Sequence, residues 1–205
     1  MCQVSDWERV LAFHGHACPG LVNGYRAALA ALERLREMRA EDEELVAIVE
    51  NDCCAVDAVQ VLTGCTFGKG NLIFRDYGKQ VFTIGSRKSG RAVRVAVRKS
   101  GQSDPSYTAL MNKVMAGTAG PEEREAFAAM REARIRELLE MPEEELLDVR
   151  EARVDLPPKA RIFRSVVCSS CGEAAMEPRV RMRDGEPVCI PCADNYATPL
   201  AGGGK

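Results

Sequence analysis

The chain has 205 residues, of which 46% are hydrophobic and 28% charged, and its formal net charge at pH 7 is -2. This length can bury the core of one main domain and leaves room for a small second one. No apolar run approaches the ~20 residues that cross a bilayer, so we expect no membrane span. The first residues carry acids where a signal peptide has its apolar core, which predicts a cytoplasmic location.

The chain contains nine cysteines, an unusually high number for a protein without an export signal. In a reducing compartment such cysteines are more often metal ligands or reactive thiols than disulfides. Four of them form two CxxC pairs near the C-terminus, and four more fall in the first third of the chain. Two separate cysteine chemistries are therefore indicated.

The most unusual stretch is His14-Gly-His16-Ala-Cys18-Pro-Gly20, which contains both histidines of the chain. A short amphipathic helix is predicted before it, over residues 4–13, and a longer helix after it, over 21–38. Alternate positions lie on one side of an extended backbone, and imidazole with thiolate suits transition metals. The sequence thus favours a metal site or a catalytic thiolate, and the alternative is an ordinary turn between helices with a buried thiol.

A strand followed by a helix is predicted next. Residues 45–49 are all apolar, as in a strand covered on both faces, and residues 53–64 read as a helix that ends at Gly64. Cys54 and Asp57 are three residues apart, so they share one helix face. They lie at the N-terminal end of the helix, which follows the strand. Functional sites are common at that edge of α/β sheets, which makes both residues site candidates.

The glycine-rich segment 63–72 contains Cys65 and Lys69 and resembles a binding loop. Its backbone amides and Lys69 could hold an anion, but the spacing departs from the GxxxxGK[ST] nucleotide motif. A simple glycine-rich connection is an equal alternative for Lys69. For Cys65 we favour a functional role.

The rest of the first domain reads as strands followed by helices. Strands are predicted at 72–77, 80–84 and 92–98 as an antiparallel meander, helices at 106–116 and 121–141, one further turn at 143–147, and a strand at 149–154. The charged faces of the helix at 121–141 are typical of solvent exposure. We expect an α+β fold with a mixed or antiparallel sheet packed against helices, and a domain boundary at the proline-rich segment 156–159. The two domains are then 1–160 and 161–205.

The second domain carries a strong zinc signature, in which two CxxC pairs lie seventeen residues apart: Cys168, Cys171, Cys189 and Cys192. Between the pairs, Asp184-Gly185 predicts a hairpin turn. Four thiolates leave no open coordination position, so this zinc is expected to be structural, and so small a module needs its metal to fold.

Nucleic-acid binding is disfavoured for this module. From Lys159 to the end there are seven Lys or Arg against five Asp or Glu, and a zinc ion with four thiolates adds about two negative charges. The basic excess typical of nucleic-acid binders is therefore missing. A role in protein contact or dimerisation fits better.

Two long motifs resemble the FmdE family, whose members are named after a component of formylmethanofuran dehydrogenase. They are the His14 to Gly20 segment and the segment from Cys54-Ala-Val-Asp57 through Cys65-Thr-Phe-Gly-Lys69-Gly-Asn71. The resemblance covers about residues 5–155 and implies an α+β core, a treble-clef zinc finger in members with the C-terminal extension, and a homodimer. It implies an active region made of His14, His16, Cys18, Cys54, Asp57, Cys65 and Lys69, and leaves Cys53 outside.

Three functional hypotheses follow. In the first, His14, His16, Cys18, Cys54 and Cys65 supply ligands for a core transition metal, Asp57 is a ligand or orients one, and Lys69 contacts a small anionic substrate. Such a protein would be an accessory or catalytic subunit of a larger oxidoreductase complex in molybdenum- or tungsten-linked one-carbon metabolism. In the second, it is a non-enzymatic metal carrier or assembly adaptor that uses the finger for protein contact. In the third, Cys18 and Cys65 are reactive thiols without a metal.

Overall fold

The computed structural model describes residues 4–98 and 105–193, and the chain divides into two compact units, residues 1–160 and 161–205. The first unit is built on a five-stranded sheet of strand order β2-β1-β3-β4-β5. Its strands are β1 (Leu45–Val49), β2 (Leu72–Phe74), β3 (Val81–Ser86), β4 (Ala92–Val97) and β5 (Leu147–Ala152). The expected α+β class with a mixed sheet is confirmed.

The sheet topology corrects one expectation. Strand β2 does not pair with β3 in a meander; it pairs in parallel with β1, which lies between β2 and β3. Strands β3, β4 and β5 are antiparallel neighbours. All five residues of β1 are buried, as expected from its apolar run, and a fully apolar strand belongs at a covered central position rather than at an edge.

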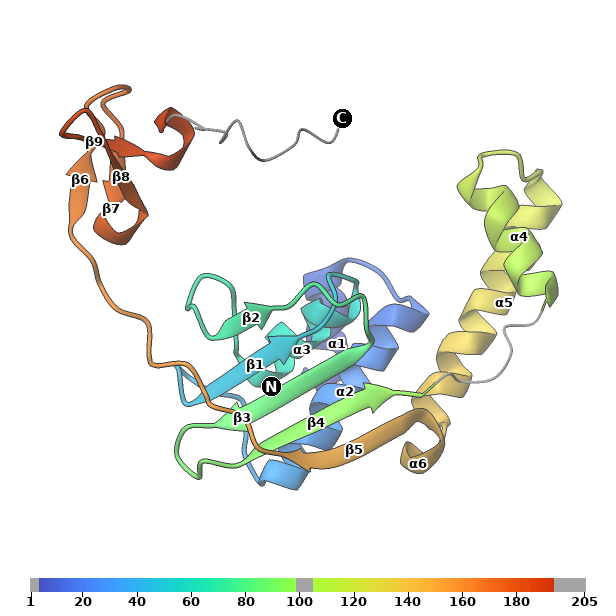
Figure 1. Ribbon diagram of the computed structural model, residues 1–205. Helices are drawn as coiled ribbons and strands as arrows, with labels where there is room; N and C mark the ends of the chain where they lie inside the picture. Colours follow the sequence, from blue (N-terminus) through green and yellow to red (C-terminus); the bar gives the residue numbers. More distant parts are fainter. Residues whose placement is uncertain (1–3, 99–104, 194–205) are drawn as a thin grey trace, which may run out of the picture. The chain divides into compact units, whose positions relative to one another are not determined.

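Three helices cover one face of the sheet (Figure 1): α1 (Asp6–His14), α2 (Pro19–Leu35) and α3 (Ala55–Thr63). Their apolar side chains form one core with alternate residues of the strands, among them Ala47, Phe82 and Val93. Helix α1 is capped by Ser5, whose side chain forms a reciprocal capping box with Glu8. Helix α3 ends at Gly64, as expected, where φ is 73°.

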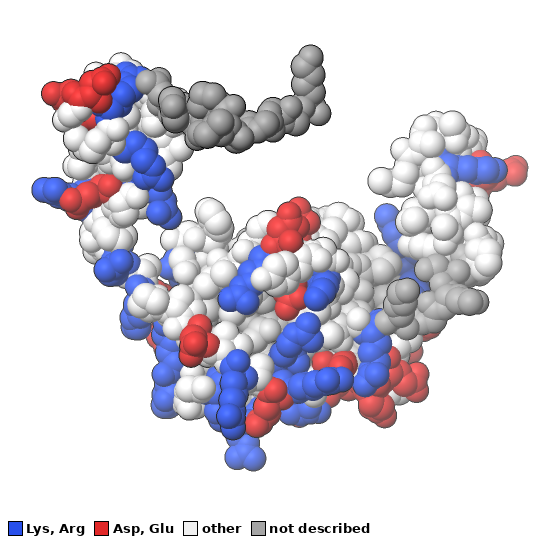
Figure 2. All heavy atoms as spheres, in the orientation of Figure 1, with Lys and Arg blue, Asp and Glu red and all other residues white. Residues whose placement is uncertain are grey.

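The opposite face of the sheet is more polar. Arg94 on β4 and Arg150 on β5 lie on it because the alternate residues Val93 and Val95 belong to the core. Each arginine pairs with a nearby acid, Glu50 and Asp148 respectively. In Figure 2, basic and acidic side chains are interspersed over this face, as expected from the nearly neutral chain.

Two long helices extend from this unit: α4 (Pro105–Met115) and α5 (Pro121–Glu140), followed by the single turn α6 (Glu143–Leu146). Helix α4 packs against the first half of α5, where the rings of Tyr107 and Phe127 lie 5.3 Å apart. The end of α5 is fixed to α2, because the Arg26 guanidinium donates hydrogen bonds of 2.8–2.9 Å to the carbonyls of Leu138, Leu139 and Met141. Leu138 is the only buried residue of α5, so the expected solvent exposure of this helix is confirmed.

The second unit consists of two small hairpins. Strands β6 (Ser165–Val167) and β7 (Ala174–Met176) form the first, and β8 (Val180–Arg183) and β9 (Glu186–Cys189) form the second. The 3-10 turns η1 (Glu177–Arg179) and η2 (Ile190–Cys192) precede β8 and follow β9. The expected Asp184-Gly185 turn is present, with φ values of 52° and 83°, as a two-residue hairpin turn requires.

No helix in the described parts of the chain is long and apolar enough to cross a membrane.

Candidate metal centre

The four cysteines of the second unit lie together. The sulfurs of Cys168, Cys171, Cys189 and Cys192 are all within 4.8 Å of one another, and the Cys171 and Cys189 sulfurs are 3.8 Å apart. Ligands at the ~2.3 Å zinc–sulfur distance of a tetrahedral site are about 3.8 Å apart. Backbone amides of Cys171 and Cys189 point to Cys168 and lower the pKa of its thiol to about 6, which favours the thiolate that zinc needs. Four sulfurs at these distances fit a closed tetrahedral zinc site.

The first unit contains a second group of metal-binding side chains. Ligand atoms of His14, His16 and Cys18 lie within 4.8 Å of one another, and the two imidazole rings are 4.6 Å apart between centroids. The sequence suggested a continuously extended backbone through these residues, but only Cys18 is seen in an extended conformation. His14 is the last residue of α1, Gly15 follows with φ of 89°, and Cys18 caps α2. A left-handed glycine between two helices, rather than strand alternation, therefore makes this cluster.

Helix α2 holds the Cys18 sulfur in place. The helix begins at Pro19 rather than at Leu21, and Cys18 is its N-cap, with the sulfur accepting a hydrogen bond from the Leu21 amide at 3.3 Å. Pro19 fits the first helical position because it lacks an amide hydrogen that would otherwise be unpaired. The start of α2 therefore fixes the position of the Cys18 sulfur next to the two histidines.

Helix α3 brings a carboxylate and a second thiol to the same place. A carboxylate oxygen of Asp57, in the first turn of α3, lies 2.7 Å from Nδ1 of His14, and Cys54 directly precedes the helix. Because Nδ1 of His14 is engaged with the Asp57 carboxylate, Nε2 is the nitrogen that can bind a metal ion. Nε2 lies 4.0 Å from the Cys18 sulfur. Adjacent nitrogen and sulfur ligands of a tetrahedral zinc ion are roughly 3.5 Å apart, so the donor set fits a metal ion.

Cys54 is a neighbour of Cys18. Burial, followed by the adjacent Cys18, raises the pKa of the Cys54 thiol above its ordinary value, so without a cation it is held as the neutral thiol. A β-carbon added at Gly20 would lie 3.5 Å from the Cys54 β-carbon and 3.9 Å from the Cys18 sulfur. Gly20 therefore leaves open the space beside the Cys18 sulfur and the Cys54 β-carbon.

Two of the candidate residues lie elsewhere. Cys54 precedes α3, whereas Cys65 follows its C-terminal end, and the nine-residue helix between them is about 13 Å long. The Lys69 ammonium donates to the carbonyls of Glu41 at 2.9 Å and Gly64 at 3.1 Å. The structure therefore does not bring Cys65 or Lys69 to the histidine cluster, and Lys69 fastens the glycine-rich loop instead of facing an anion.

We expect Cys65 to be unreactive in the folded protein. It is fully buried, and burial raises the pKa of its thiol from 9.0 to about 11. At pH 8 the thiolate fraction is then on the order of one in a thousand. Iodoacetamide followed by peptide mass spectrometry is expected to leave Cys65 unlabelled while it labels Cys53, and rapid labelling of Cys65 would contradict this.

The same thiol makes stability depend on pH. The folded pKa of Cys65 lies above the unfolded one, so the unfolded chain loses this proton first, and the unfolding free energy falls as pH rises from 9 to about 11. Two pKa units correspond to about 2.7 kcal/mol, an upper value. Denaturant titrations of Cys65→Ala are expected to show a shallower fall over this window than those of the wild type.

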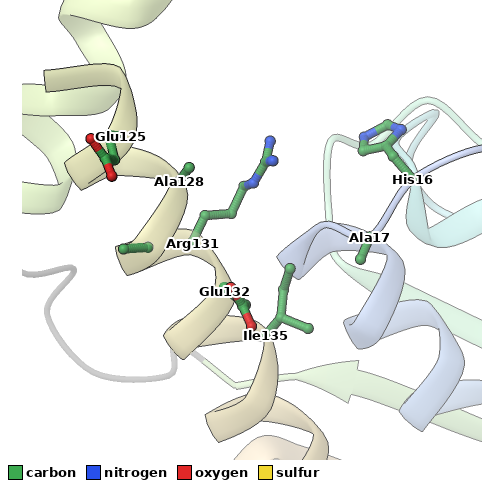
Figure 3. Close-up of a pocket in the computed structure, with 8 residues that line it drawn as sticks. His16, Ala17, Glu125, Ala128, Arg131, Glu132 and Ile135 are labelled. Atoms are coloured by element: carbon green, nitrogen blue, oxygen red, sulfur yellow. The ribbon is translucent and has the colours of Figure 1, made fainter. Parts of the chain in front are cut away.

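Sequence reasoning missed the surface that faces this cluster. Helix α5 lies across a groove from His16 and presents Ala128, Ala129 and Arg131 to it (Figure 3). The only local signal was the adjacent pair Ala128-Ala129 in a helix rich in Glu and Arg. The alanine pair alone does not predict a groove, because only the tertiary structure places this helix opposite His16.

The fold and the two clusters thus define a metal-binding protein with an α+β core and a C-terminal four-cysteine zinc finger. A family model described as "FmdE, Molybdenum formylmethanofuran dehydrogenase operon" matches residues 13–148. One described as "Prokaryotic dksA/traR C4-type zinc finger" matches residues 161–196. The chain belongs to the FmdE family and carries this zinc finger at its C-terminus.

Two relatives are informative. A crystal structure of a tungsten formylmethanofuran dehydrogenase FmdE-like protein from Syntrophus aciditrophicus aligns with a TM-score of 0.60 and 28% identity, over 90% of this chain and 88% of that one. A protein from Archaeoglobus fulgidus described as "Probable S-adenosyl-L-methionine-binding protein" is 38% identical over 196 residues. That match takes in 92% of this chain but only 52% of the archaeal protein, so the chain spans about half the length of this relative.

Proposed function

We propose that the core unit binds a transition metal through His14, His16 and Cys18, with Cys54 beside them and Asp57 orienting His14. The observation that carries the proposal is that three helix ends meet: the end of α1 and the starts of α2 and α3. These ends, with the short loop after α1 that carries His16, contribute all five groups. Two imidazoles and a thiolate with an ordered carboxylate partner suit a borderline-soft ion such as zinc.

The cluster has the features of a working site rather than a purely structural one. His16 is exposed, whereas His14 and Cys18 are half-buried, so one side of the cluster faces solvent. Three protein ligands and an open position are typical of catalytic zinc, and a bound ion there would supply Lewis acidity. The chain itself contributes the Asp57–His14 hydrogen bond that orients the imidazole, a cysteine sulfur held at a helix start, and the room that Gly20 leaves beside that sulfur.

We further propose that this metal site serves a cytoplasmic accessory or catalytic subunit, working as a homodimer with a molybdenum- or tungsten-dependent formylmethanofuran dehydrogenase or a related one-carbon enzyme. The family match and the Syntrophus structure support this assignment. The S-adenosylmethionine named for the archaeal relative is not transferred, because that protein is nearly twice as long as the match.

A metal carrier or assembly adaptor is the second candidate. The exposed His16 favours it, since an accessible ligand can pass an ion to another protein. The ordered Asp57–His14 pair favours retention instead, because such partners raise metal affinity about 10- to 100-fold. The rate at which a chelator removes the core ion separates these two functions: minutes for a carrier, and far slower for a retained catalytic ion.

We expect the full chain, purified without chelator, to hold about two metal ions, one in each cluster. Cys18→Ser should reduce this to about one, because it removes the helix-capping thiolate, and Asp57→Asn should weaken the core ion about 10- to 100-fold. Elemental analysis and chelator competition measure both effects. Cys53→Ser is the matched control, since Cys53 contacts Asn51 and Gln80 and lies outside both clusters. A wild-type chain with one zinc ion, unchanged in Cys18→Ser, would refute a core metal site.

A further inference from the structure

A groove of about 430 Å³ separates helix α5 from the loop that carries His16. Figure 3 shows Arg131 reaching from α5 into this space on the side of His16, with Ile135 near Ala17. The groove is lined from the loop side by His16 and Ala17, and from α5 by residues that include Ala128, Arg131, Glu132 and Ile135. It is large enough for a small organic molecule.

The hollow exists because α5 carries small side chains at this level. Ala128 and Ala129 line the groove in a helix that is otherwise rich in Glu and Arg, and both are exposed. The two alanines are not part of the core, because the only buried residue of α5 is Leu138. Together with Ile135, the alanines give the groove an apolar floor.

The charged residues of the groove have both signs and are not used by the protein. Arg131, Glu125 and Glu132 line it, and within the residues that the structure describes none of the three takes part in an ion pair or a side-chain hydrogen bond. This is not general for α5, because Arg134 pairs with Glu137 at 2.7 Å. A guanidinium and a carboxylate beside an apolar floor are thus available to a ligand.

We propose that this groove binds a small zwitterion of the α-amino acid class, with its carboxylate on Arg131, its ammonium group on Glu132 and an apolar side chain over Ala128 and Ala129. A simple anion would gain Arg131 but face the two glutamates, and a simple cation would face Arg131. A zwitterion satisfies both signs, and charged hydrogen bonds are stronger than neutral ones. The inference does not depend on the proposed metal site, although His16 both lines the groove and belongs to the core metal cluster.

The test is ligand-observed NMR on the full chain with three probes of nearly equal shape: L-leucine, 4-methylpentanoate, which lacks the ammonium group, and 3-methylbutylamine, which lacks the carboxylate. Saturation-transfer titrations give the dissociation constant of each. Leucine is expected to bind at least about tenfold more tightly than either singly charged probe, because each of these loses one charged hydrogen bond.

Two variants locate the site. Arg131→Gln is expected to weaken leucine binding tenfold or more and to abolish the preference for leucine over 3-methylbutylamine, since the carboxylate then has no partner. Ala128→Leu is expected to abolish binding of leucine by filling the groove. Arg136→Gln is the matched control: it makes the same charge change on an exposed residue of the same helix outside the groove, and leucine binding should not change.

The proposal is overturned if leucine gives no saturation transfer with the wild type, if its affinity equals that of the singly charged probes, or if Arg131→Gln behaves like Arg136→Gln. Metal content is measured on the same samples. A wild type that fails to bind leucine but retains both metal ions would reject the groove alone, whereas a wild type that binds leucine but holds no core metal would reject the proposed metal site and keep the groove.

Discussion

Cys189→Ser is expected to unfold residues 165–193 and to leave the core unit folded. The second unit has little else to hold it: in its described part the only apolar cluster of buried residues consists of Cys168, Val188 and Cys189, two of which are zinc ligands. Structural zinc contributes roughly 10–16 kcal/mol in finger peptides, far more than so small a core can supply. Removal of one ligand should therefore lose both the ion and the fold.

The measurement is limited proteolysis with elemental analysis. New cleavage sites are expected only within 165–193, at the β8–β9 hairpin among others, together with the loss of about one zinc ion per chain. Cys53→Ser, which removes a thiol outside both clusters, should give the wild-type pattern. An unchanged pattern in Cys189→Ser would show that the module folds without its zinc.

Gly24→Ala is expected to destabilise the core unit by about 2 kcal/mol or more. Helices α2 and α3 cross so closely at Gly24 that an added β-carbon would lie 2.1 Å from the Ala55 carbonyl oxygen and 2.6 Å from its carbonyl carbon. Backbone atoms cannot rotate away, so the helices must separate. Overpacking of this kind costs about 1–3 kcal/mol or more, and it outweighs the gain of up to ~1 kcal/mol in helix propensity.

Thermal and denaturant unfolding of Gly24→Ala measure this loss. A fall in melting temperature of roughly 4–8 °C corresponds to 2 kcal/mol in a unit of this size. The separation would also move Cys18 on α2 away from Cys54 and Asp57 on α3, so weaker retention of the core ion is expected. Gly68→Ala is the control, since no atom lies within 4 Å of its added β-carbon and its stability should change by less than ~0.5 kcal/mol. Equal stability of the two variants would contradict the close crossing.

Local patterns in the sequence were sufficient for most elements. The apolar run at residues 45–49 became β1, Gly64 ended α3, and Asp184-Gly185 formed its turn, because each depends on neighbours a few residues away. The zinc cluster was predictable for the same reason: two CxxC pairs have few other uses.

The pairing partner of β2 was not predictable from local pattern. A strand of three residues has too few side chains to specify its neighbour, and the 72–98 region reads equally well as a meander. The pairing with β1 arises because α3 returns the chain beside β1 in parallel, a connection that only the packing of α3 on the sheet decides.

The sequence by itself determined the ligand types of this protein: two histidines and a cysteine within five residues, an aspartate near the start of a helix, and a closed four-cysteine zinc module. Only the tertiary structure decided which of the other candidates join them. In the fold, Asp57 contacts His14 and Cys54 lies beside Cys18. Cys65 lies after the far end of α3, and Lys69 donates hydrogen bonds to backbone carbonyls. Sequence distance does not fix these outcomes, because a helix carries residues at its two ends to opposite sides of the core.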